Sequence, residues 1–341
     1  MRILKRLSFT LLSIVLAALL AFSLSVWPGA MVVRITFKKG GEEMRQGLVP
    51  FERNDVHVIL DEVYTAGDPD ARMDIYIPQR MMGGDHRLPV VVWTHGGGWI
   101  GGDKSEMRGY LMHLAHEGYV VIAINYGLAP EHRYPAPLHQ INAALAHIRA
   151  NAARFLADMD RVFMAGDSAG AQLTAQTAAT ISNPDHAKAV GIAPTLGPGQ
   201  LRGLILHCGL YDMPMYVQRA NDAGGILGYL ANILPWAYLG ERKPAEDALR
   251  AMSPIHHATS AFPPVFISGG NGDPLTAHQS RPMATRLEEL GVPVTSLFFP
   301  DDHSPALPHE YQFRLAEPEA QQAFAMTLEF LKARTHPPAS R

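Results

Sequence analysis

The hydrophobic pattern of the chain consists of one long apolar segment at the N-terminus, followed by short apolar runs separated by polar turns. Eight of these runs have the length of strands and are bounded by glycine, proline or charged residues. They lie at residues 56–64, 73–77, 89–93, 119–124, 162–165, 204–208, 265–267 and 294–299. The first two are typical of an antiparallel start to a sheet, and the continuously apolar run at 89–93 indicates a strand buried on both faces.

Helices are predicted between the later strands. Residues 105–116 and 169–179 read as helices, and apolar side chains at helical spacing mark further ones around Ile141, Met283 and Phe324. Strands that alternate with helices imply a mostly parallel sheet with right-handed crossovers. We therefore expect one α/β domain over residues 55–333, with an eight-stranded sheet flanked by helices, followed by a flexible tail at 334–341.

The N-terminal segment indicates where in the cell the protein is located. Basic residues at positions 2, 5 and 6 precede residues 7–33, which contain no charge and are long enough to cross a bilayer as a helix, which needs about 20 residues. We expect residues 1–34 to be an uncleaved membrane anchor with the main domain on the extracytoplasmic, periplasmic side. The alternative is a signal segment whose cleavage leaves a secreted or periplasmic protein, although only weak cleavage sites follow. Residues 35–54, which are polar and contain glycines, predict a linker.

Residues 211–260 interrupt the alternation. They contain an apolar helical stretch between Gly225 and Gly240. This small helical insertion is either a lid that forms the wall of an acyl pocket or an extra packing helix, and composition does not separate the two.

Composition narrows the class of protein. Of 341 residues, 47% are apolar and 18% charged, which is enough to bury a sizeable core. The net charge of -3 lacks the basic excess that phosphate-backbone binding needs, so nucleic acid is not an expected partner. The single cysteine, Cys208, has no partner for an internal disulfide and lies in an apolar run, where a free thiol is usually a small core residue.

The sequence Gly166-Asp167-Ser168-Ala169-Gly170 stands where a predicted strand meets a predicted helix. A serine between two glycines at such a turn is typical of a nucleophile elbow, because small neighbours permit the sharp bend that exposes the hydroxyl. The alternative is an ordinary helix that begins at a serine cap. Ser168 is the candidate nucleophile.

A serine hydroxyl needs a base and a group that orients the base. Polar residues that directly follow parallel strands meet at one edge of the sheet, which places Asp273 and His303 near Ser168. The order serine, aspartate, histidine is that of an α/β-hydrolase. His309 is the alternative base if the last loop has a different path, and Asp212, Asp301 and Asp302 are alternatives to Asp273.

The glycines after the strand at 89–93 predict an oxyanion hole. Glycine-rich backbone brings N–H groups close to a ligand, so Gly96, Gly97 and Ala169 are the candidate donors. We expect His95 to hold the glycine loop rather than to act as an acid or base. A phosphate-binding loop is disfavoured because no lysine follows at the required spacing.

Together these motifs resemble the hormone-sensitive-lipase-like esterases of the α/β-hydrolase superfamily, and in particular bacterial carboxylesterases related to the feruloyl and acetyl esterases. The resemblance rests on His95 to Trp99, Tyr126 to Glu131, Gly166 to Gly170, Asp273 to Leu275 and His303. It implies hydrolysis of short- or medium-chain esters without a cofactor or metal, by a triad of Ser168, Asp273 and His303. One departure is that the family's usual His-Gly-Phe corresponds here to His303-Ser304-Pro305.

We therefore expect a membrane-tethered serine carboxylesterase that acts on small-molecule esters. A peptidase on the same fold and a catalytically silent binding protein of the cell envelope are the alternatives. Acyl and alcohol specificity and the oligomeric state do not follow from the sequence.

Overall fold

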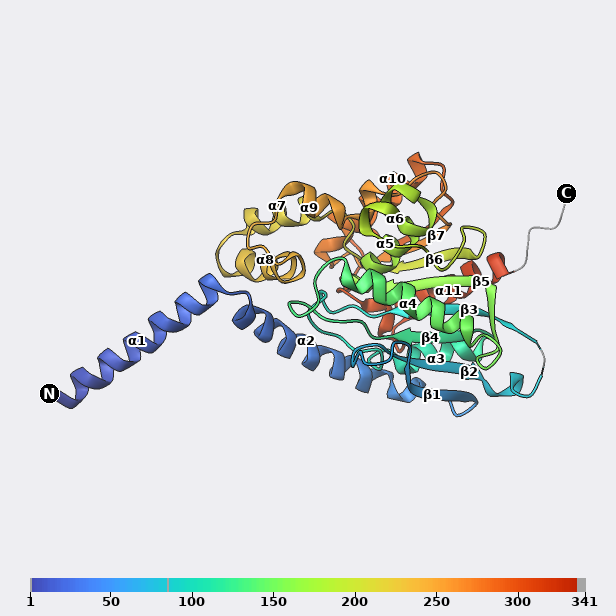
Figure 1. Ribbon diagram of the computed structural model, residues 1–341, viewed down its shortest axis with the longest axis horizontal. Helices are drawn as coiled ribbons and strands as arrows, with labels where there is room; N and C mark the ends of the chain where they lie inside the picture. The colour runs from blue at the N-terminus through green and yellow to red at the C-terminus, as the bar shows by residue number, and fades with distance from the viewer. Residues whose placement is uncertain (1, 85, 336–341) are drawn as a thin grey trace.

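A sheet of eight strands forms the centre of the molecule (Figure 1). The structure, a computed structural model, describes residues 2–84 and 86–335. Each strand falls on a predicted apolar run, which confirms the predicted fold class. The strands are β1 (Val56–Val63), β2 (Arg72–Pro78), β3 (Leu88–Thr94), β4 (Val120–Ile124), β5 (Ala157–Asp167), β6 (Leu201–His207), β7 (Val265–Gly269) and β8 (Val294–Phe298).

The strand order is β1-β2-β4-β3-β5-β6-β7-β8. β1 pairs with β2, and β2 with β4, in antiparallel fashion, whereas all later pairs are parallel. The carboxyl ends of β3, β5, β6 and β7 therefore lie along one edge of the sheet, where ligands bind in open α/β folds.

Helices cover both faces of the sheet because the central strands are apolar on both sides. In β3, Val90 and Val92 belong to the core cluster on the face covered by α4, α5 and α10, while Val91 and Trp93 belong to the cluster on the other face, with α3 and α11. The helices of the domain are α3 (Arg108–His116), α4 (Ala136–Ala150), α5 (Ser168–Ser182), α6 (Pro184–Val190), α10 (Arg281–Glu289) and α11 (Pro318–Thr335). The predicted tail begins in the last turn of α11, and its residues 336–341 lie outside the described part.

The segment predicted as a linker at 35–54 is instead mostly helical. Helix α2 (Trp27–Leu48) packs along the domain. Arg34 attaches it by donating hydrogen bonds to the carbonyl oxygens of Ile100 and Ala129 and to the carboxylate of Glu131, at 2.7–2.8 Å. The prediction of an irregular linker was wrong because contacts with the domain stabilise this helix, whereas its sequence has no regular apolar stripe that would indicate one.

The insertion at 211–260 forms helices α7 (Met213–Ala223), α8 (Gly225–Leu239) and α9 (Glu246–Ala251). Helix α8 packs against the start of α2, where a side chain on Gly29 would collide with Ile233. Tyr229 and Arg242 donate hydrogen bonds to the carbonyl oxygens of Phe22 and Ser23. The insertion and the N-terminal helices therefore form one assembly beside the sheet edge.

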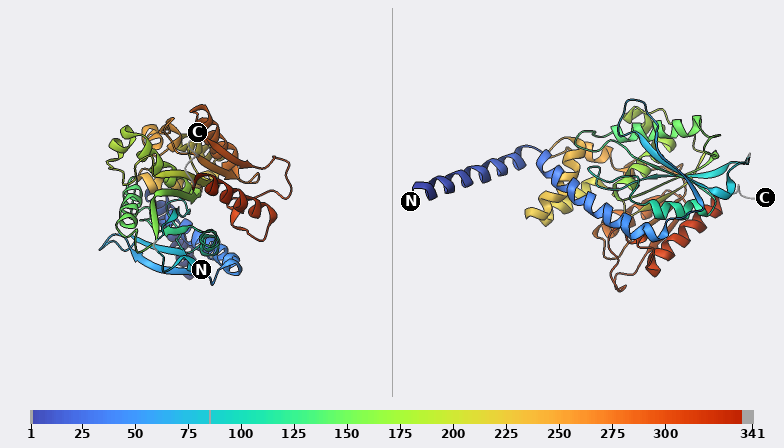
Figure 2. Two further views of the ribbon diagram at one scale, coloured as in Figure 1. Left: turned by 90° about the vertical axis from the view of Figure 1, so that its right-hand side faces the viewer. Right: turned by 90° about the horizontal axis from the view of Figure 1, so that it is seen from below.

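Helix α1 (Arg2–Leu24) projects away from the domain, as Figure 1 and the right-hand view of Figure 2 show. Its apolar side chains, among them Phe9, Leu11 and Leu19, are exposed. No single helix among the described residues is both long and apolar enough to cross a membrane. The stretches Ser8–Leu24 and Trp27–Phe51 meet the length and composition criteria only as a pair, with a bend of 86° between them.

Candidate active site

Ser168 occupies the turn between β5 and α5 and has a left-handed backbone conformation, with φ at 51°. The neighbouring glycines make this turn possible. A Cβ atom on Gly170 would lie 2.1 Å from the carbonyl oxygen of Thr94, and one on Gly166 would lie 2.5 Å from the backbone of Gly170. The predicted nucleophile elbow is therefore present, because only glycine fits at both positions.

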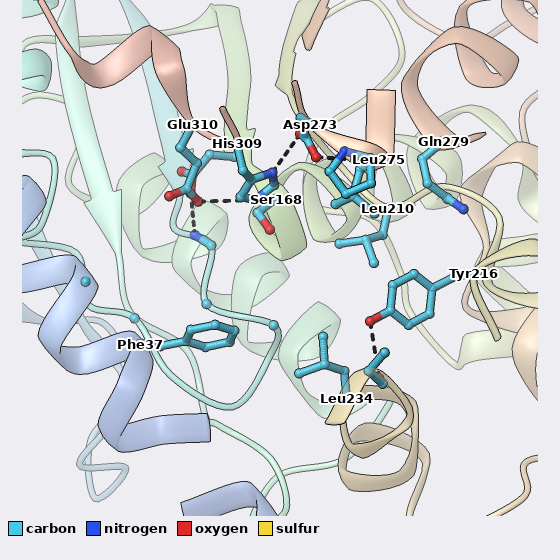
Figure 3. Close-up of a pocket in the computed structure, with 18 of the residues that line it drawn as sticks. Phe37, Ser168, Leu210, Tyr216, Leu234, Asp273, Leu275, Gln279, His309 and Glu310 are labelled. Carbon is cyan, nitrogen blue, oxygen red and sulfur yellow. Dashed lines mark hydrogen bonds and ion pairs between the residues drawn. The ribbon is translucent and has the colours of Figure 1, made fainter. Parts of the chain in front are cut away.

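The Ser168 side chain faces a cavity of about 740 Å³ whose lining is mostly apolar (Figure 3). Helix α2, the glycine loop after β3, helices α7 and α8, and the loops after β6, β7 and β8 form its walls. The segment predicted as a linker and the insertion at 211–260 both contribute to the cavity wall. Helix α2 supplies Phe37 and Met44, and the insertion supplies Tyr216, Ala220 and Leu234. The insertion is a wall of the cavity as well as a packing element, since Ile233 and Trp236 are buried.

Asp273 lies in the loop after β7 and contacts His309, with Oδ2 2.7 Å from Nδ1 of the ring. Its other oxygen accepts the backbone N–H of Leu275 at 2.9 Å. The carboxylate is almost completely buried, whereas the His309 side chain is 35% exposed and lines the cavity with Ser168. In Figure 3 the imidazole lies between Asp273 and the serine.

The expectation that Asp273 holds His303 is wrong. Nε2 of His303 lies 3.1 Å from the Glu319 carboxylate of α11, and its ring packs on Phe299. His303 does not belong to the cavity lining. It lies in the loop after β8, but its side chain points to α11.

The path of the loop after β8 explains this difference. The Asn271 side chain donates a hydrogen bond to the carbonyl oxygen of His303 and accepts one from the N–H of Leu307, both at 2.8 Å. The N–H of Gly272 donates to the Leu307 carbonyl oxygen at 2.9 Å. These bonds draw the loop back across the end of β7, so the residue that reaches Asp273 is His309, the alternative base of the sequence analysis.

One sequence signal for His309 was available. The family's His-Gly-Phe matches His309-Glu310-Tyr311 better than His303-Ser304-Pro305, because an aromatic residue stands in the third position. Glu310 has a φ of 59°, the left-handed conformation that glycine adopts most easily. The departure from the family pattern is therefore a glutamate in a glycine-like conformation.

Cys208, at the end of β6, is a buried neighbour of the Asp273–His309 pair. Burial raises the pKa of its thiol. Burial of the His309 ring by itself lowers the pKa of His309, whereas the hydrogen bond to Asp273 and the negative charge of Glu310 raise it. Donor atoms of the three residues lie within 4.8 Å of one another, a spacing compatible with a metal ion. Since Asp273 and His309 already satisfy each other, the arrangement needs no ion to be stable.

Asp167 organises the glycine loop and changes the expected set of oxyanion donors. One carboxyl oxygen accepts the Trp93 indole N–H at 2.8 Å, and the other accepts the Gly96 N–H at 2.9 Å. Burial raises the pKa of Asp167 well above its ordinary value, and the nearby Glu310 adds to this effect. The Gly96 N–H is therefore occupied, contrary to the prediction.

The next two amides are available. Gly97 and Gly98 have positive φ angles of 98° and 58° and line the cavity. Within residues 2–84 and 86–335, neither of their N–H groups has a hydrogen-bond acceptor. The Ala169 N–H lies in the first turn of α5, where backbone donors have no partner inside the helix. Gly97, Gly98 and Ala169 thus supply the free amides around Ser168.

His95 is packed as a structural residue would be. Its Nδ1 atom lies 2.8 Å from the Gly96 carbonyl oxygen, and its ring stacks on Tyr126 with centroids 4.5 Å apart. Burial lowers its pKa, which keeps the ring neutral. The Tyr126 hydroxyl donates to the His95 carbonyl oxygen at 3.0 Å, so the pair pins the glycine loop.

Comparisons with known proteins identify the family and relatives of the chain. Residues 91–305 match a family described by its alpha/beta hydrolase fold. The chain is 31% identical over 255 residues to carboxylesterase NlhH of Mycobacterium tuberculosis, covering 73% of this chain and 75% of that protein. It is 28% identical over 242 residues to esterase LipC of the same organism, covering 70% and 57% respectively.

Solved structures share the fold. Esterase B of Lactobacillus rhamnosis superposes with a TM-score of 0.77 at 21% identity, covering 91% of this chain and 96% of that one. The esterase of Pyrobaculum calidifontis superposes with a TM-score of 0.69 at 24% identity, covering 89% and 92%. Esterase B is also known with a tributyrin phosphonate inhibitor, at a TM-score of 0.75.

Proposed function

The chain belongs to the α/β-hydrolase family and is a carboxylic ester hydrolase, and we propose that it cleaves short- to medium-chain esters with Ser168 as its nucleophile. The observation that carries this proposal is the contact between Asp273 and His309 in the cavity that Ser168 lines. These three side chains have the chemistry of a nucleophile, a base and a group that orients the base.

In the proposed reaction, Nε2 of His309 takes the proton of the Ser168 hydroxyl while the serine oxygen attacks the ester carbonyl. Asp273, bound to Nδ1, keeps the ring in the tautomer whose Nε2 accepts a proton, and stabilises the imidazolium that forms. The imidazolium then gives its proton to the departing alcohol, which leaves an acyl group on Ser168. A water molecule, deprotonated by His309, hydrolyses the acyl enzyme and restores the serine.

The negative oxygen of each tetrahedral intermediate is assigned to the amides of Gly97, Gly98 and Ala169. Asp167 supports this role indirectly, because its bond to Gly96 holds the loop so that the next two N–H groups remain free. One such donor contributes roughly 3 to 4 kcal/mol of transition-state stabilisation in comparable enzymes.

The size of the acyl group is inferred from the cavity. A volume of about 740 Å³ and an apolar side formed by Leu210, Tyr216 and Leu234 suit an aliphatic chain. Each Å² of apolar ligand surface that is buried against this side contributes about 25 cal/mol to the free energy of binding. Affinity is expected to rise from acetate to medium-chain esters and then to fall once the chain exceeds the cavity.

The test uses the full-length enzyme in detergent with p-nitrophenyl esters of two to twelve carbons. Ser168→Ala is expected to abolish hydrolysis, and a fluorophosphonate probe is expected to label the wild type and not the variant. Equal activity in the variant would sink the mechanism. A profile that increases without limit to twelve carbons would contradict the short- to medium-chain assignment.

We also propose that α1 anchors the enzyme in a membrane, with the domain on the periplasmic side. Support comes from the uncharged residues 7–24 of α1, from the basic residues that precede them, and from the exposed apolar surface of α1. Trp27, which is 46% exposed where α1 meets α2, suits the water–lipid interface.

Cell fractionation with alkaline carbonate extraction tests the anchor. The intact chain is expected in the membrane pellet, and protease added to intact spheroplasts is expected to digest the domain. A soluble protein whose mass lacks the first 20 to 30 residues would show instead that the segment is a cleaved signal. Protection of the domain in intact spheroplasts would contradict the orientation.

A further inference from the structure

Glu310 is the residue of the cavity whose backbone least suits its side chain. Its φ of 59° is a conformation that side chains other than glycine rarely adopt. The conformation directs the glutamate into the cavity beside His309, where it is 22% exposed. A residue held in this way at an active site points to a role in function.

The Glu310 carboxylate lies next to the atom that handles the proton. Its Oε1 is 3.7 Å from Nε2 of His309, the nitrogen opposite the one that Asp273 holds. In the proposed reaction Nε2 protonates the leaving alcohol, so the alcohol oxygen must be next to Nε2 as it departs. The alcohol half of the ester therefore leaves past Glu310.

The two sides of Ser168 differ in chemistry. In Figure 3, Glu310 and Phe37 lie on one side of the serine, and Leu210 and Tyr216 lie on the other. The second side matches an aliphatic acyl chain. The first side offers a carboxylate together with an aromatic ring, and both attract cations.

A second carboxyl group lines the cavity on the α2 side. The Glu106 carboxyl packs against Gly41 of α2. Burial raises the pKa of Glu106 to about 8, and Asp103 and Glu310 add to the effect, so this carboxyl is mostly protonated near neutral pH and Glu310 is the group that carries the negative charge. Among the described residues, neither Glu106 nor Glu310 forms an ion pair with a lysine or arginine. The guanidinium in the cavity lining, Arg219, belongs to α7, the helix that supplies Tyr216 to the apolar side.

We propose that Glu310 is a specificity residue that selects esters whose alcohol half carries a positive charge. The inference rests on the proposed function, since it assigns the two halves of the ester from the reaction at Ser168 and His309. The cation would meet the Glu310 carboxylate in a partly desolvated cavity, where attraction between opposite charges is stronger than in water.

The test compares two esters of nearly equal shape. Butyrylcholine carries a quaternary nitrogen in its alcohol half, and 3,3-dimethylbutyl butyrate has a neutral carbon in the same place. With the full-length enzyme in a pH-stat, kcat/KM is expected to be at least about tenfold higher for butyrylcholine, which corresponds to about 1.4 kcal/mol. In Glu310→Gln and Glu310→Gly the ratio is expected to fall to about one.

Two controls make the outcome readable. Glycine suits a φ of 59°, so Glu310→Gly is expected to fold even if Glu310→Gln does not. Glu317→Gln removes a carboxylate that pairs with Arg314 outside the cavity, and it is expected to keep the wild-type ratio. Since both esters report on the same His309, a change in its pKa cancels in the ratio.

A wild-type ratio near one, or a ratio that survives both Glu310 substitutions, would overturn the inference. Neither result would contradict the proposed function if the wild type still hydrolyses the neutral ester and Ser168→Ala does not. If Ser168→Ala hydrolyses the neutral ester as fast as the wild type, the proposed function itself fails.

Discussion

His309 and Asp273 are 36 residues apart in the chain and meet through a single hydrogen bond, with Nδ1 2.7 Å from Oδ2. The contact joins the loop after β8 to the end of β7. It leaves Nε2 of the ring directed into the cavity that contains Ser168.

Substitutions of the two histidines are therefore expected to differ greatly. His309→Ala should lower kcat by about 10⁴-fold or more, because it removes the base of the triad. His303→Ala should lose only its contact with Glu319 and keep kcat within roughly a factor of three, as expected for a group that does not touch the reacting atoms. Initial rates with p-nitrophenyl butyrate measure both. Loss of activity in folded His303→Ala, with activity retained in His309→Ala, would restore His303 as the base.

The activity of the enzyme should depend on pH through His309. The ring must be neutral to accept a proton, and the hydrogen bond to Asp273 and the nearby Glu310 carboxylate hold its pKa above the ordinary value. The acidic limb of kcat/KM is therefore expected at a pH above 6.5, with activity rising as pH increases through that pKa.

Glu310→Gln tests the sign of this effect. Removing a carboxylate 3.7 Å from Nε2 destabilises the imidazolium, which lowers the pKa of His309 and moves the limb to lower pH. Profiles between pH 5 and 9 with the neutral ester provide the measurement. A limb that stays in place or moves to higher pH would contradict the electrostatic role of Glu310.

The elbow should depend on its glycines for stability. Gly170→Ala places a methyl group against the Thr94 carbonyl oxygen and should lower the free energy of unfolding by about 2 kcal/mol, which is a fall in Tm of roughly 3 °C in a chain of this size. Gly199→Ala is the matched control, because no atom lies within 4 Å of a Cβ there. Thermal unfolding followed by circular dichroism compares the two. Equal Tm values would show that the backbone at the elbow relaxes at little cost.

Helix α2 should be needed for a stable cavity. Arg34→Ala removes bonds to two carbonyl oxygens and an ion pair with Glu131, which together should contribute about 1 to 2 kcal/mol after allowance for solvent screening. The same substitution is expected to raise KM, since α2 places Phe37 in the cavity wall.

Arg45→Ala is the control within the same helix, because among the described residues Arg45 forms its ion pair with Glu42 of the same helix, on the surface. It is expected to leave both Tm and KM close to the wild-type values. An Arg34 variant that behaves like the Arg45 variant would show that α2 does not depend on this attachment.

The sequence by itself determined most of the architecture. The eight strands, the helices between them and the elbow at Ser168 follow from apolar periodicity and from glycines at turns, which are local properties of the chain. The candidate Asp273 was also identified in this way, because it directly follows a predicted strand.

Only the tertiary structure decided which groups meet at Ser168. His309 rather than His303 reaches Asp273 because Asn271 and Gly272 redirect the last loop through hydrogen bonds between distant segments. Gly98 rather than Gly96 has a free amide because a side chain 71 residues away occupies the Gly96 N–H. Helix α2 forms a wall of the cavity because Arg34 attaches it to loops about 66 to 97 residues further along the chain. Periodicity is encoded in neighbouring residues, whereas these three outcomes depend on contacts that exist only after the chain has folded.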